Sequence, residues 1–491
     1  MIAAVVRNGR WADSARLMSA ARAAEDVPGV EAAACFMGTP ANLEQARDLG
    51  LMTPEIADAG PDDLVVSVRG EAAEMGLIAA QAALDVRPVG GGTGEGEALP
   101  RSVAGLDADL ALISVPGEYA ALEAHRALGA GMDVMLFSDG VTLDDEVALK
   151  RRAHSLGRLV MGPGCGTAIL GGVGLAFANE VARGPVGVVA AAGTGAQEAT
   201  VLLDRFGVGV SECYGTGGRD LTARVGAITA LDAIERLSSD EATEVLLLIS
   251  KPPAPEVASR VLEAMAATGR PGAACLVGAE GIEGPDGIEV HPTIDAAVLA
   301  AARLAGARPV IPAPEPTSWV SAGHVRGLFS GGTLCSEAAA ILAARLGRVV
   351  SNAPAGSAVR LEPGEVVRGH ACIDLGEEEY TRGRPHPMID PEARAEMLAG
   401  TIMDQTVAVI LLDVVLGYGS HPDPAGALAP ALAQALQARP SLQVVAHVCG
   451  TEADPQPLSQ QEATLRALGV RLAPTSAQAA RLAAALVRSA G

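Results

Sequence analysis

Short runs of β-branched and small apolar residues alternate with Ala-, Leu- and Arg-rich segments of helical periodicity along almost the whole chain. Runs such as EVLLLIS and VGVVAAAG have the length of strands, and a helical pattern follows each of them. This alternation is typical of α/β domains in which helices cover parallel sheets. Because only 2% of the residues are aromatic, the cores must be built from Ala, Val and Leu. We therefore expect a multidomain α/β protein with parallel sheets.

Length and two linker-like segments indicate how the chain divides. Its 491 residues exceed the size of one ordinary domain. A Gly- and Pro-rich stretch at 86–104 and a Pro-rich stretch at 309–322 interrupt the alternating pattern and predict linkers. We expect four globular portions around them, at residues 1–85, 105–180, 181–308 and 323–491.

Composition excludes several classes of function. A net charge of −22 without a basic stripe argues against nucleic acid as a partner. Seven cysteines are scattered with no CxxC pair and no histidine cluster, so we expect neither a metal site nor a disulfide framework. The first residues lack the pattern of a signal peptide, and the longest apolar runs have only strand length. These features predict a soluble cytoplasmic protein that does not bind membranes.

Four glycine-rich turns follow predicted strands: MGPGCGT at 161–167, AGTGAQE at 192–198, YGTGGRD at 214–220 and SGGTLCSEA at 330–338. Ligands of parallel sheets bind beyond the carboxyl ends of the strands, and a helix N-terminus with open backbone N–H groups attracts anions. We therefore expect a phosphate or carboxylate site in these turns, although tight strand-to-helix turns would look the same. The candidate residues are Gly193, Thr194, Gly195, Gly217, Gly218, Gly331, Gly332 and Thr333.

Two glutamates fall in the first turns of the helices that follow, Glu198 and Glu337. Each could cap a helix or orient a substrate amine, and capping is the commoner use. Cys165 and Cys335 also lie near helix starts, a position that lowers a thiol pKa. No histidine stands close to either thiol in its motif, so we do not expect a catalytic cysteine.

The segment GRPHPMIDPEAR gathers charged residues between prolines: Arg384, His386, Asp390 and Arg394. Arginine binds carboxylates in a bidentate manner, and histidine can move a proton near neutral pH. This pattern favours a fixed substrate loop with His386 and Arg384 as catalytic candidates. The alternative is a rigid structural strap whose charges pair with the neighbouring DLGEEEY.

The glycine-rich turns carry a resemblance to a known family. VMGPGCGTAIL and GPVGVVAAAGTGAQEATVLLDRFGVGVSECYGTGGRDL resemble the succinyl-CoA synthetase α-subunit, and GLFSGGTLCSEAAAIL resembles the ligase domain of its β-subunit. With MGTPANLEQARDLGL, LLDVVLGYGSHPDPAG and GTEADPQ, the whole chain is similar to the FdrA-like acyl-CoA synthetase homologues. The resemblance implies Rossmann-like and flavodoxin-like sheets, a CoA-binding-like portion at 105–180, an α-subunit-like portion at 181–308 and a β-subunit-like portion at 323–491.

The chain departs from the synthetase pattern at the positions that carry its chemistry. The region that should hold a phosphorylated histidine reads LVGAEGIEGPDGIEVHPTID, in which His291 lacks flanking small residues and is more simply a surface-loop histidine. Ala190 and Ala192 replace the two serines usual in the phosphate loop. Neither the glycine turn that holds CoA phosphates nor an ATP-grasp domain has a counterpart.

The resemblance implies a subunit of a heteromeric carbamoyltransferase that transfers carbamoyl between carbamoyl phosphate and oxamate or oxalurate in purine and allantoin breakdown. The alternatives are an NDP-forming acyl-CoA ligase that uses a phosphoenzyme, and a non-catalytic binding or scaffold subunit. No cofactor is expected with certainty; CoA and ATP or ADP belong to the ligase alternative alone. Expected partners are a small phosphorylated substrate and other enzyme subunits, in a homo- or hetero-oligomer.

Overall fold

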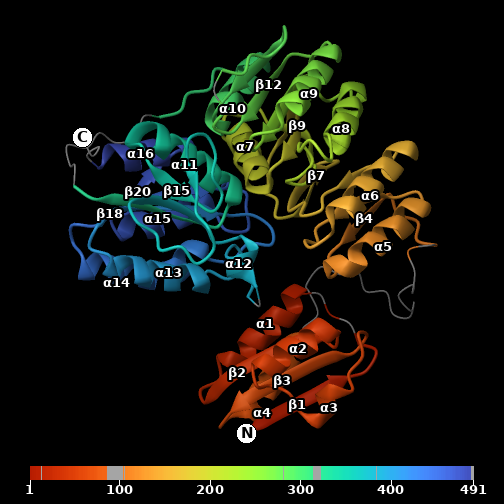
Figure 1. Cartoon of the computed structure of the whole chain (residues 1–491), viewed down its shortest axis with the longest axis vertical. Coiled ribbons are helices and arrows are strands. Elements are labelled where there is room, and N and C mark those ends of the chain that lie inside the picture. Colours follow the sequence, from red (N-terminus) through yellow and green to blue (C-terminus); the bar gives the residue numbers. More distant parts are fainter. Residues whose placement is uncertain are drawn as a thin grey trace. The chain divides into compact units, whose positions relative to one another are not determined.

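The computed structural model describes residues 1–10, 12, 14–85, 103, 105–279, 281–312, 322–382 and 384–487 (Figure 1). It divides into two compact units, Met1–Pro100 and Arg101–Gly491. The division falls inside the predicted linker 86–104, of which residues 86–102 and 104 lie outside the described residues. Residues 313–321 of the second predicted linker also lie outside them.

The first unit contains a three-stranded sheet in the order β1-β3-β2. Both outer strands are antiparallel to β3, so the expectation of a parallel sheet is wrong for this unit. The reason is topological, because β3 inserts between two strands that the α1 crossover leaves parallel to each other. Helices α1 and α4 pack on one face, and the shorter α2 and α3 contribute to a second small core on the other. The elements are β1 (Ile2–Arg7), α1 (Ser14–Glu25), β2 (Val30–Met37), α2 (Pro40–Asp48), α3 (Pro54–Ala57), β3 (Leu64–Gly70) and α4 (Ala73–Asp85).

The second unit begins with a small parallel sheet and continues into a seven-stranded one. The small sheet has the order β4-β5-β6, and the larger one has the order β13-β12-β11-β9-β10-β7-β8 with a parallel centre. Its elements are β4 (Leu110–Ile113), α5 (Gly117–Gly129), β5 (Asp133–Leu136), α6 (Leu143–Ser155), β6 (Val160–Met161), β7 (Thr167–Leu170), β8 (Val173–Ala176), β9 (Arg183–Ala191), α7 (Gly193–Arg205), β10 (Val210–Gly215), α8 (Ile228–Ser239), β11 (Val245–Ser250), α9 (Pro255–Ala267), β12 (Gly272–Leu276), β13 (Ile288–His291) and α10 (Ile294–Leu304).

The hairpin of β7 and β8 pairs through β7 with β10 and belongs to the larger sheet. The expected boundary between 180 and 181 therefore falls too late in the chain. Residues 167–176 have the short apolar pattern of a final strand of the preceding sheet, and the sequence does not indicate which sheet they join.

A second seven-stranded sheet follows, in the order β16-β15-β17-β14-β18-β19-β20, and all its pairs are parallel. The α/β class with parallel sheets is thus confirmed for the second unit. The elements are β14 (His324–Phe329), α11 (Gly332–Leu346), β15 (Val349–Ser351), β16 (Val359–Arg360), β17 (His370–Asp374), α12 (Glu378–Thr381), α13 (Glu392–Met403), β18 (Val407–Val415), α14 (Pro424–Ala438), β19 (Gln443–Cys449), α15 (Leu458–Ala467), β20 (Arg471–Ala473) and α16 (Ser476–Ala485).

The two large sheets share one hydrophobic core. Helices α7 and α10 of the central sheet pack against α11 and α16 of the C-terminal sheet, and buried alanines line their contacts. Small side chains let the helix backbones approach closely, which a core with so few aromatic residues requires. The four helices thus join the sheets into one packed body.

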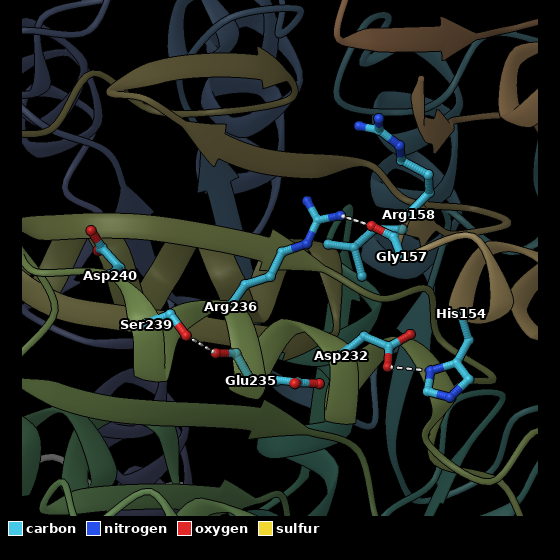
Figure 2. A pocket seen from close by; sticks show the side chains of 9 residues that line it. His154, Gly157, Arg158, Asp232, Glu235, Arg236, Ser239 and Asp240 are labelled. Atoms are coloured by element: carbon cyan, nitrogen blue, oxygen red, sulfur yellow. Dashed lines mark hydrogen bonds and ion pairs between the residues drawn. The ribbon is translucent and has the colours of Figure 1, made fainter. Parts of the chain in front are cut away.

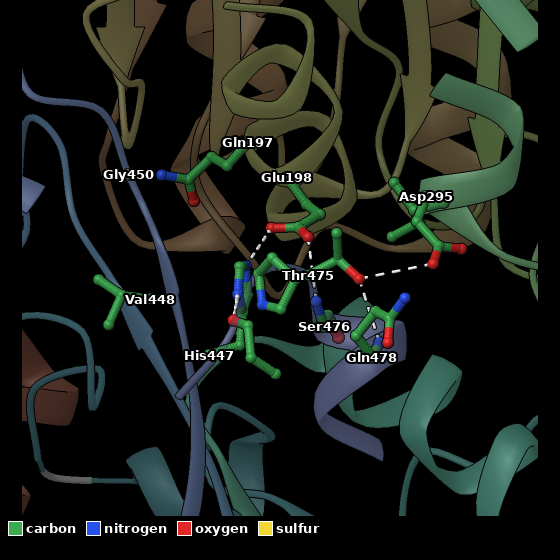
Figure 3. Close-up of polar contacts among 12 residues, drawn as sticks. Gln197, Glu198, Asp295, His447, Val448, Gly450, Thr475, Ser476 and Gln478 are labelled. Atoms are coloured by element: carbon green, nitrogen blue, oxygen red, sulfur yellow. Dashed lines mark hydrogen bonds and ion pairs between the residues drawn. The ribbon is translucent and has the colours of Figure 1, made fainter. Parts of the chain in front are cut away.

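Two buried glutamates, Glu198 and Glu337, cap helices across this core, and Figure 3 shows the contacts of Glu198. Glu198 of α7 accepts a hydrogen bond from the Ser476 N–H at the start of α16, at 3.1 Å, and its other oxygen lies 2.7 Å from His447 Nε2. Glu337 of α11 accepts a hydrogen bond of 2.7 Å from the Ile294 N–H at the start of α10. Each glutamate thus caps a helix of the neighbouring sheet, whereas the expectation was a cap on its own helix.

The two caps differ in charge. Burial acts to raise the pKa of Glu198, but the nearby His447, Arg205 and the Ser476 N–H outweigh it, so the pKa lies below its ordinary value. Burial, and then the adjacent Asp295, raise the pKa of Glu337 to about 8. Glu198 is therefore an ionised cap beside an imidazole, whereas Glu337 is a protonated cap at neutral pH.

Glu337→Gln should remove a pH dependence of stability. Between the ordinary pKa of 4.5 and a folded-state pKa of about 8, the folded chain holds a proton that the unfolded chain releases. The free energy of unfolding of the wild-type chain should therefore fall as pH rises through this interval, by at most about 1.4 kcal/mol per pH unit for one proton. Denaturant unfolding at several pH values measures the slope, and the variant should have the shallower one.

Glu198→Gln is the matched control. It removes the carboxylate partner of the buried His447 Nε2 and should lower the free energy of unfolding at neutral pH by about 1–3 kcal/mol, the cost of leaving a buried polar group unpaired. Equal slopes for the wild-type chain and Glu337→Gln would contradict the protonated cap.

Candidate functional site

The N-termini of α7 and α11 touch each other. The Thr333 N–H donates a hydrogen bond of 3.3 Å to Thr194 Oγ1. A Cβ built on Gly331 would lie 2.9 Å from the Thr194 side chain, and one on Gly195 would lie 2.9 Å from Thr333 Cγ2. The structure thus brings the two glycine turns of the sequence analysis, Gly193–Gly195 and Gly331–Thr333, into one place.

Several backbone donors remain open at this junction. Neither helix has a side-chain cap, and the N–H groups of Gly193, Thr194, Gly195, Gly332 and Leu334 have no acceptor among the described residues. Close packing explains why residues 195 and 331 must be glycine. A Cβ on Gly193, in contrast, would have Thr167 Oγ1 as its nearest neighbour, at an unstrained 3.8 Å. A side chain would fit at Gly193, so a tight turn alone does not require glycine there. Two helix dipoles and open N–H groups give the junction the partial positive charge and the hydrogen-bond donors that attract anions.

Two charged residues that the sequence analysis missed lie beside this junction. Lys251 follows β11, and its Nζ lies 3.6 Å from the place that a Gly332 Cβ would take. Asp374 ends β17, is 4% exposed, and places Oδ2 2.4 Å from the same point. Lys251 directly follows a buried strand and Asp374 is the last residue of one, and this position was the only signal in the sequence.

Lys251 is distinctive because the sequence contains only one other lysine, Lys150. Lys150 is fully buried and lies 2.9 Å from Glu146 Oε1 and 2.7 Å from Asp220 Oδ1. Lys251 is partly exposed, and the described residues include no hydrogen-bond acceptor or ion-pair partner for it. It can therefore supply positive charge to an anion at the helix junction.

Hydrogen bonds hold both the backbone and the carboxyl group of Asp374 in place. Asn352 bonds to the Asp374 backbone N–H and carbonyl at 2.8 Å each, and the Gly376 N–H donates to Oδ1 at 2.9 Å. Burial raises its pKa to about 7, while Lys251 acts to lower it. This carboxyl changes its charge near neutral pH.

His386 reaches the same place from the proline-rich segment. Its Nε2 lies 2.6 Å from the position of a Cβ on Gly376, and its ring centroid lies 5.8 Å from that of Phe177. The Met388 N–H donates to His386 Nδ1 at 3.2 Å. Burial lowers the pKa of His386 to about 4, so the imidazole is neutral at neutral pH.

The other charged residues of the GRPHPMID segment lie elsewhere. Arg384 is exposed and pairs with Glu396 at 2.6 Å rather than with DLGEEEY. Asp390 accepts a hydrogen bond of 3.0 Å from the Glu392 N–H. Arg394 is buried 3.1 Å from Asp413, whose carboxylate accepts the Ser330 and Gly331 N–H groups. Arg394 therefore supports the turn before α11 through Asp413, and neither arginine is directed at the helix junction.

The remaining candidates have structural contacts. A Cβ on Gly217 would lie 2.6 Å from the Pro163 carbonyl, whereas Gly218 has open space around it. His291 ends the edge strand β13, which β12 and β11 separate from β9, and its Nε2 lies 3.4 Å from Glu289 Oε2. Burial raises the pKa of Cys165 to about 12 and that of Cys335 well above its ordinary value, in agreement with the expectation of no catalytic thiol.

A separate cleft of about 590 Å³ lies between the end of α6 and α8 (Figure 2). Three of its charged or titratable side chains already have partners: Arg236 binds Asp133 at 2.5 and 2.9 Å, and His154 Nδ1 lies 2.8 Å from Asp232. None of the candidate residues from the sequence lines this cleft.

Within the described residues, no group of His, Cys, Asp and Glu side chains is arranged to hold a metal ion. None of the described helices has the length and apolarity to cross a bilayer.

Comparisons with known proteins identify the relatives of this chain. It is 38% identical to the uncharacterized protein YahF of Escherichia coli K12, over 98% of this chain and 97% of that protein. The chain belongs to the family of YahF. Residues 328–486 match the CoA-ligase family model, and residues 1–98 match the model described as AllF, heavy metal-associated domain.

Other proteins resemble this chain over only part of its length or at low sequence identity. The succinate–CoA ligase [ADP-forming] subunit alpha 1 of Archaeoglobus fulgidus is 29% identical over 30% of this chain and 52% of that subunit. The ADP-forming sulfoacetate-CoA ligase subunit SauD of Bilophila wadsworthia is 30% identical over 23% of this chain and 40% of that subunit. The dinucleotide-forming acetyl-coenzyme A synthetase 1 of Ca. Korarchaeum cryptofilum aligns over 79% of this chain and 84% of its own at 17% identity and a TM-score of 0.33.

These findings confirm the relation to CoA ligases and succinyl-CoA synthetases, and they favour the ligase alternative over the carbamoyltransferase expectation, which they do not support. They do not name the FdrA-like group. The description of the N-terminal model refers to heavy metals, but the cysteine of this unit, Cys35, is half-buried, and burial raises its pKa to about 12. The residues of this unit do not fit a thiolate metal site.

The structure gives a matched pair of glycine substitutions. Gly332→Ala would place a methyl group against Asp374 Oδ2 and should lower the free energy of unfolding by about 1–3 kcal/mol through overpacking. Gly218→Ala meets open space and should change it by less than about 0.5 kcal/mol. Denaturant unfolding measures both, and equal effects would contradict the close approach of Asp374 to α11.

Proposed function

We propose that the unit from Arg101 to Gly491 binds the phosphoryl group of an acyl phosphate at the junction of α7 and α11 and catalyses acyl transfer of the CoA-ligase type. The observation that carries this proposal is the contact of two uncapped helix N-termini through Thr194 and Thr333, with Lys251 beside them. The similarity to ADP-forming CoA ligases supports the same class of reaction.

The geometry suits a phosphate that gains charge as it leaves. When an acceptor attacks the acyl carbon of an acyl phosphate, the bond between that carbon and the phosphate oxygen breaks and phosphate departs. Backbone N–H groups of Gly193–Gly195 and Gly332, together with two helix dipoles, stabilise the departing anion without moving. Thr194 can donate its hydroxyl proton to the anion, and Lys251 neutralises part of its charge.

Several expected site residues have other roles in this proposal. Glu198 and Glu337 are occupied as helix caps, and Arg394 acts on the SGG turn through Asp413. Arg384 lies in a surface ion pair. Of the four catalytic candidates from the sequence, His386 is the one kept.

The glycines at the carboxyl edge of the sheet β4-β5-β6 are explained without CoA. A Cβ on Gly117 would lie 2.4 Å from the Asp139 carbonyl, and one on Gly164 would lie 2.7 Å from Asp139 Oδ1, so close packing accounts for both glycines, and this edge presents a carboxyl group where CoA phosphates need hydrogen-bond donors. Arg219 is held there by Glu146 at 2.8 Å and by the Val141 carbonyl at 2.8 Å. We derive no step through CoA.

This mismatch favours a second candidate function, carbamoyl transfer, because carbamoyl phosphate is an acyl phosphate and its transfer to an amide or amine needs no CoA. The oxamate or oxalurate acceptor, further subunits, an oligomer and a cytoplasmic location remain proposals that accompany it. A non-catalytic scaffold would bind neither acyl phosphate nor phosphate at the junction.

Inorganic phosphate should protect Lys251 from an amine-specific reagent such as trinitrobenzenesulfonate. Because Lys150 is buried in ion pairs, peptide mass spectrometry follows Lys251 alone among the lysine side chains. Lys251→Met should weaken phosphate binding about 10- to 100-fold, the effect of losing a hydrogen bond to a charged group. Isothermal titration with phosphate, acetyl phosphate, carbamoyl phosphate, CoA and ATP measures the affinities.

Arg303→Met is the control, since it removes a positive charge from the exposed end of α10 and should leave the phosphate affinity unchanged. Labelling of Lys251 at the same rate with and without phosphate would overturn the proposal. Tight binding of CoA would favour the ligase over carbamoyl transfer.

A further inference from the structure

Two titratable side chains converge on Gly376. A Cβ at this residue would lie 3.1 Å from Asp374 Oδ1, 2.6 Å from His386 Nε2 and 3.3 Å from His386 Cε1. The second oxygen of Asp374 is directed at the first residue of α11, since it lies 2.4 Å from the place of a Gly332 Cβ. Asp374 therefore stands between His386 and the open N–H groups of the helix junction.

The hydrogen bonds of His386 fix its tautomer. Met388 donates its N–H to Nδ1, so Nδ1 carries a lone pair and the neutral ring holds its proton on Nε2. That nitrogen is the one directed at Gly376 and the site. His386 is accordingly a hydrogen-bond donor, and Nε2 has no lone pair with which to accept a phosphoryl group.

The oxygen Oδ2 of Asp374 accepts no hydrogen bond from a described residue, whereas Oδ1 is engaged by Gly376. The charged groups that act on Asp374 are Lys251 after β11, Glu377 before α12 and Asp413 on β18, and Asp374 in turn acts on the titratable side chains of Cys335 and Tyr380. His386 faces Asp374 across the position of a Gly376 Cβ. Asp374 thus has one free carboxylate oxygen, which lies beside the helix junction and near Lys251. This oxygen can accept a proton from a group that approaches an anion bound at the junction.

We propose that Asp374 is the general base of acyl transfer at this site and that His386 is a neutral hydrogen-bond donor to the acyl oxygen, an inference that rests on the proposed function. Asp374 takes the proton of an acceptor H–X while X forms a bond to the acyl carbon. His386 Nε2–H stabilises the carbonyl oxygen as it becomes negative. The bond from the acyl carbon to the phosphate oxygen then breaks, and the phosphate held by α7 and α11 receives the proton from Asp374.

Asp374→Asn keeps the shape of the side chain and its bond to the Gly376 N–H but removes the base. With acetyl phosphate or carbamoyl phosphate as donor and hydroxylamine as acceptor, kcat should fall about 10²- to 10⁴-fold. The affinity for inorganic phosphate should stay equal or increase, because a negative charge beside the anion is lost. The pH profile of the wild-type chain should rise to a plateau through about pH 7, with Asp374 ionised on the plateau, and the variant should lack this limb.

The donor role of His386 predicts a graded response. His386→Gln retains an N–H donor and should lose about tenfold or less in kcat, whereas His386→Leu should lose about 10²-fold or more. His154→Gln, a substitution of an exposed histidine on α6, is the control and should keep full activity. After incubation with labelled acetyl phosphate, no acid-labile phosphate should be attached to the wild-type chain.

Each failure has a separate meaning. Loss of phosphate protection at Lys251 would remove the proposed function itself. Protection at Lys251 together with an unchanged rate and pH limb in Asp374→Asn would overturn the base alone. A chain that binds phosphate but transfers from neither acyl phosphate would overturn the transfer reaction of the proposed function, and the base with it. Phosphorylation of His386, or equal losses in His386→Gln and His386→Leu, would overturn the donor role.

Discussion

The contact on which the site depends is the exchange of helix caps between the two large sheets. Glu198 and Glu337 lie shortly after the glycine turns of α7 and α11, and each binds the start of a helix on the opposite side of the shared core. These bonds fix how far α7 and α11 can slide past each other. As a result the Gly193–Gly195 and Gly331–Thr333 turns meet, and their open N–H groups point to one place.

The shared core excludes water from these caps, and this exclusion shifts the pKa of each carboxyl group. A buried carboxylate keeps its charge only with a partner, as Glu198 does beside His447. Glu337 has Asp295 as neighbour instead and holds a proton. The same rule governs Asp374, where burial and one nearby lysine leave the carboxyl close to its titration point. Removal of water acts to raise the pKa of all three carboxyl groups, and the partners of each one decide whether it is an ionised cap, a neutral cap or a titratable group.

The sequence allowed the α/β class and the strand-to-helix turns to be predicted, because hydrophobic periodicity and glycine positions are local signals. It did not reveal Lys251, which follows an ordinary strand, or Asp374, which ends one, because these residues come to lie beside the helix junction only when two sheets pack together. Arg384 and Arg394 belong to one motif, yet Arg384 is exposed to solvent, whereas Arg394 is buried with only 3% of its surface exposed. Which side of a segment faces the core depends on tertiary packing. The antiparallel sheet of the first unit was missed for a similar reason, because the sequence pattern of one strand does not indicate which strands pair with it.

The two helices that form the junction belong to a single polypeptide. When two separate chains build a site between them, its completeness depends on their concentration, and their interface must offset the translational and rotational entropy of association. Within one chain the effective concentration of each half around the other is set by the length of the connection and does not fall on dilution. The contact between α7 and α11 therefore does not have to provide the free energy of association. The junction can be polar and partly open, built of glycines and threonines, whereas two separate subunits would need a tightly packed apolar interface there.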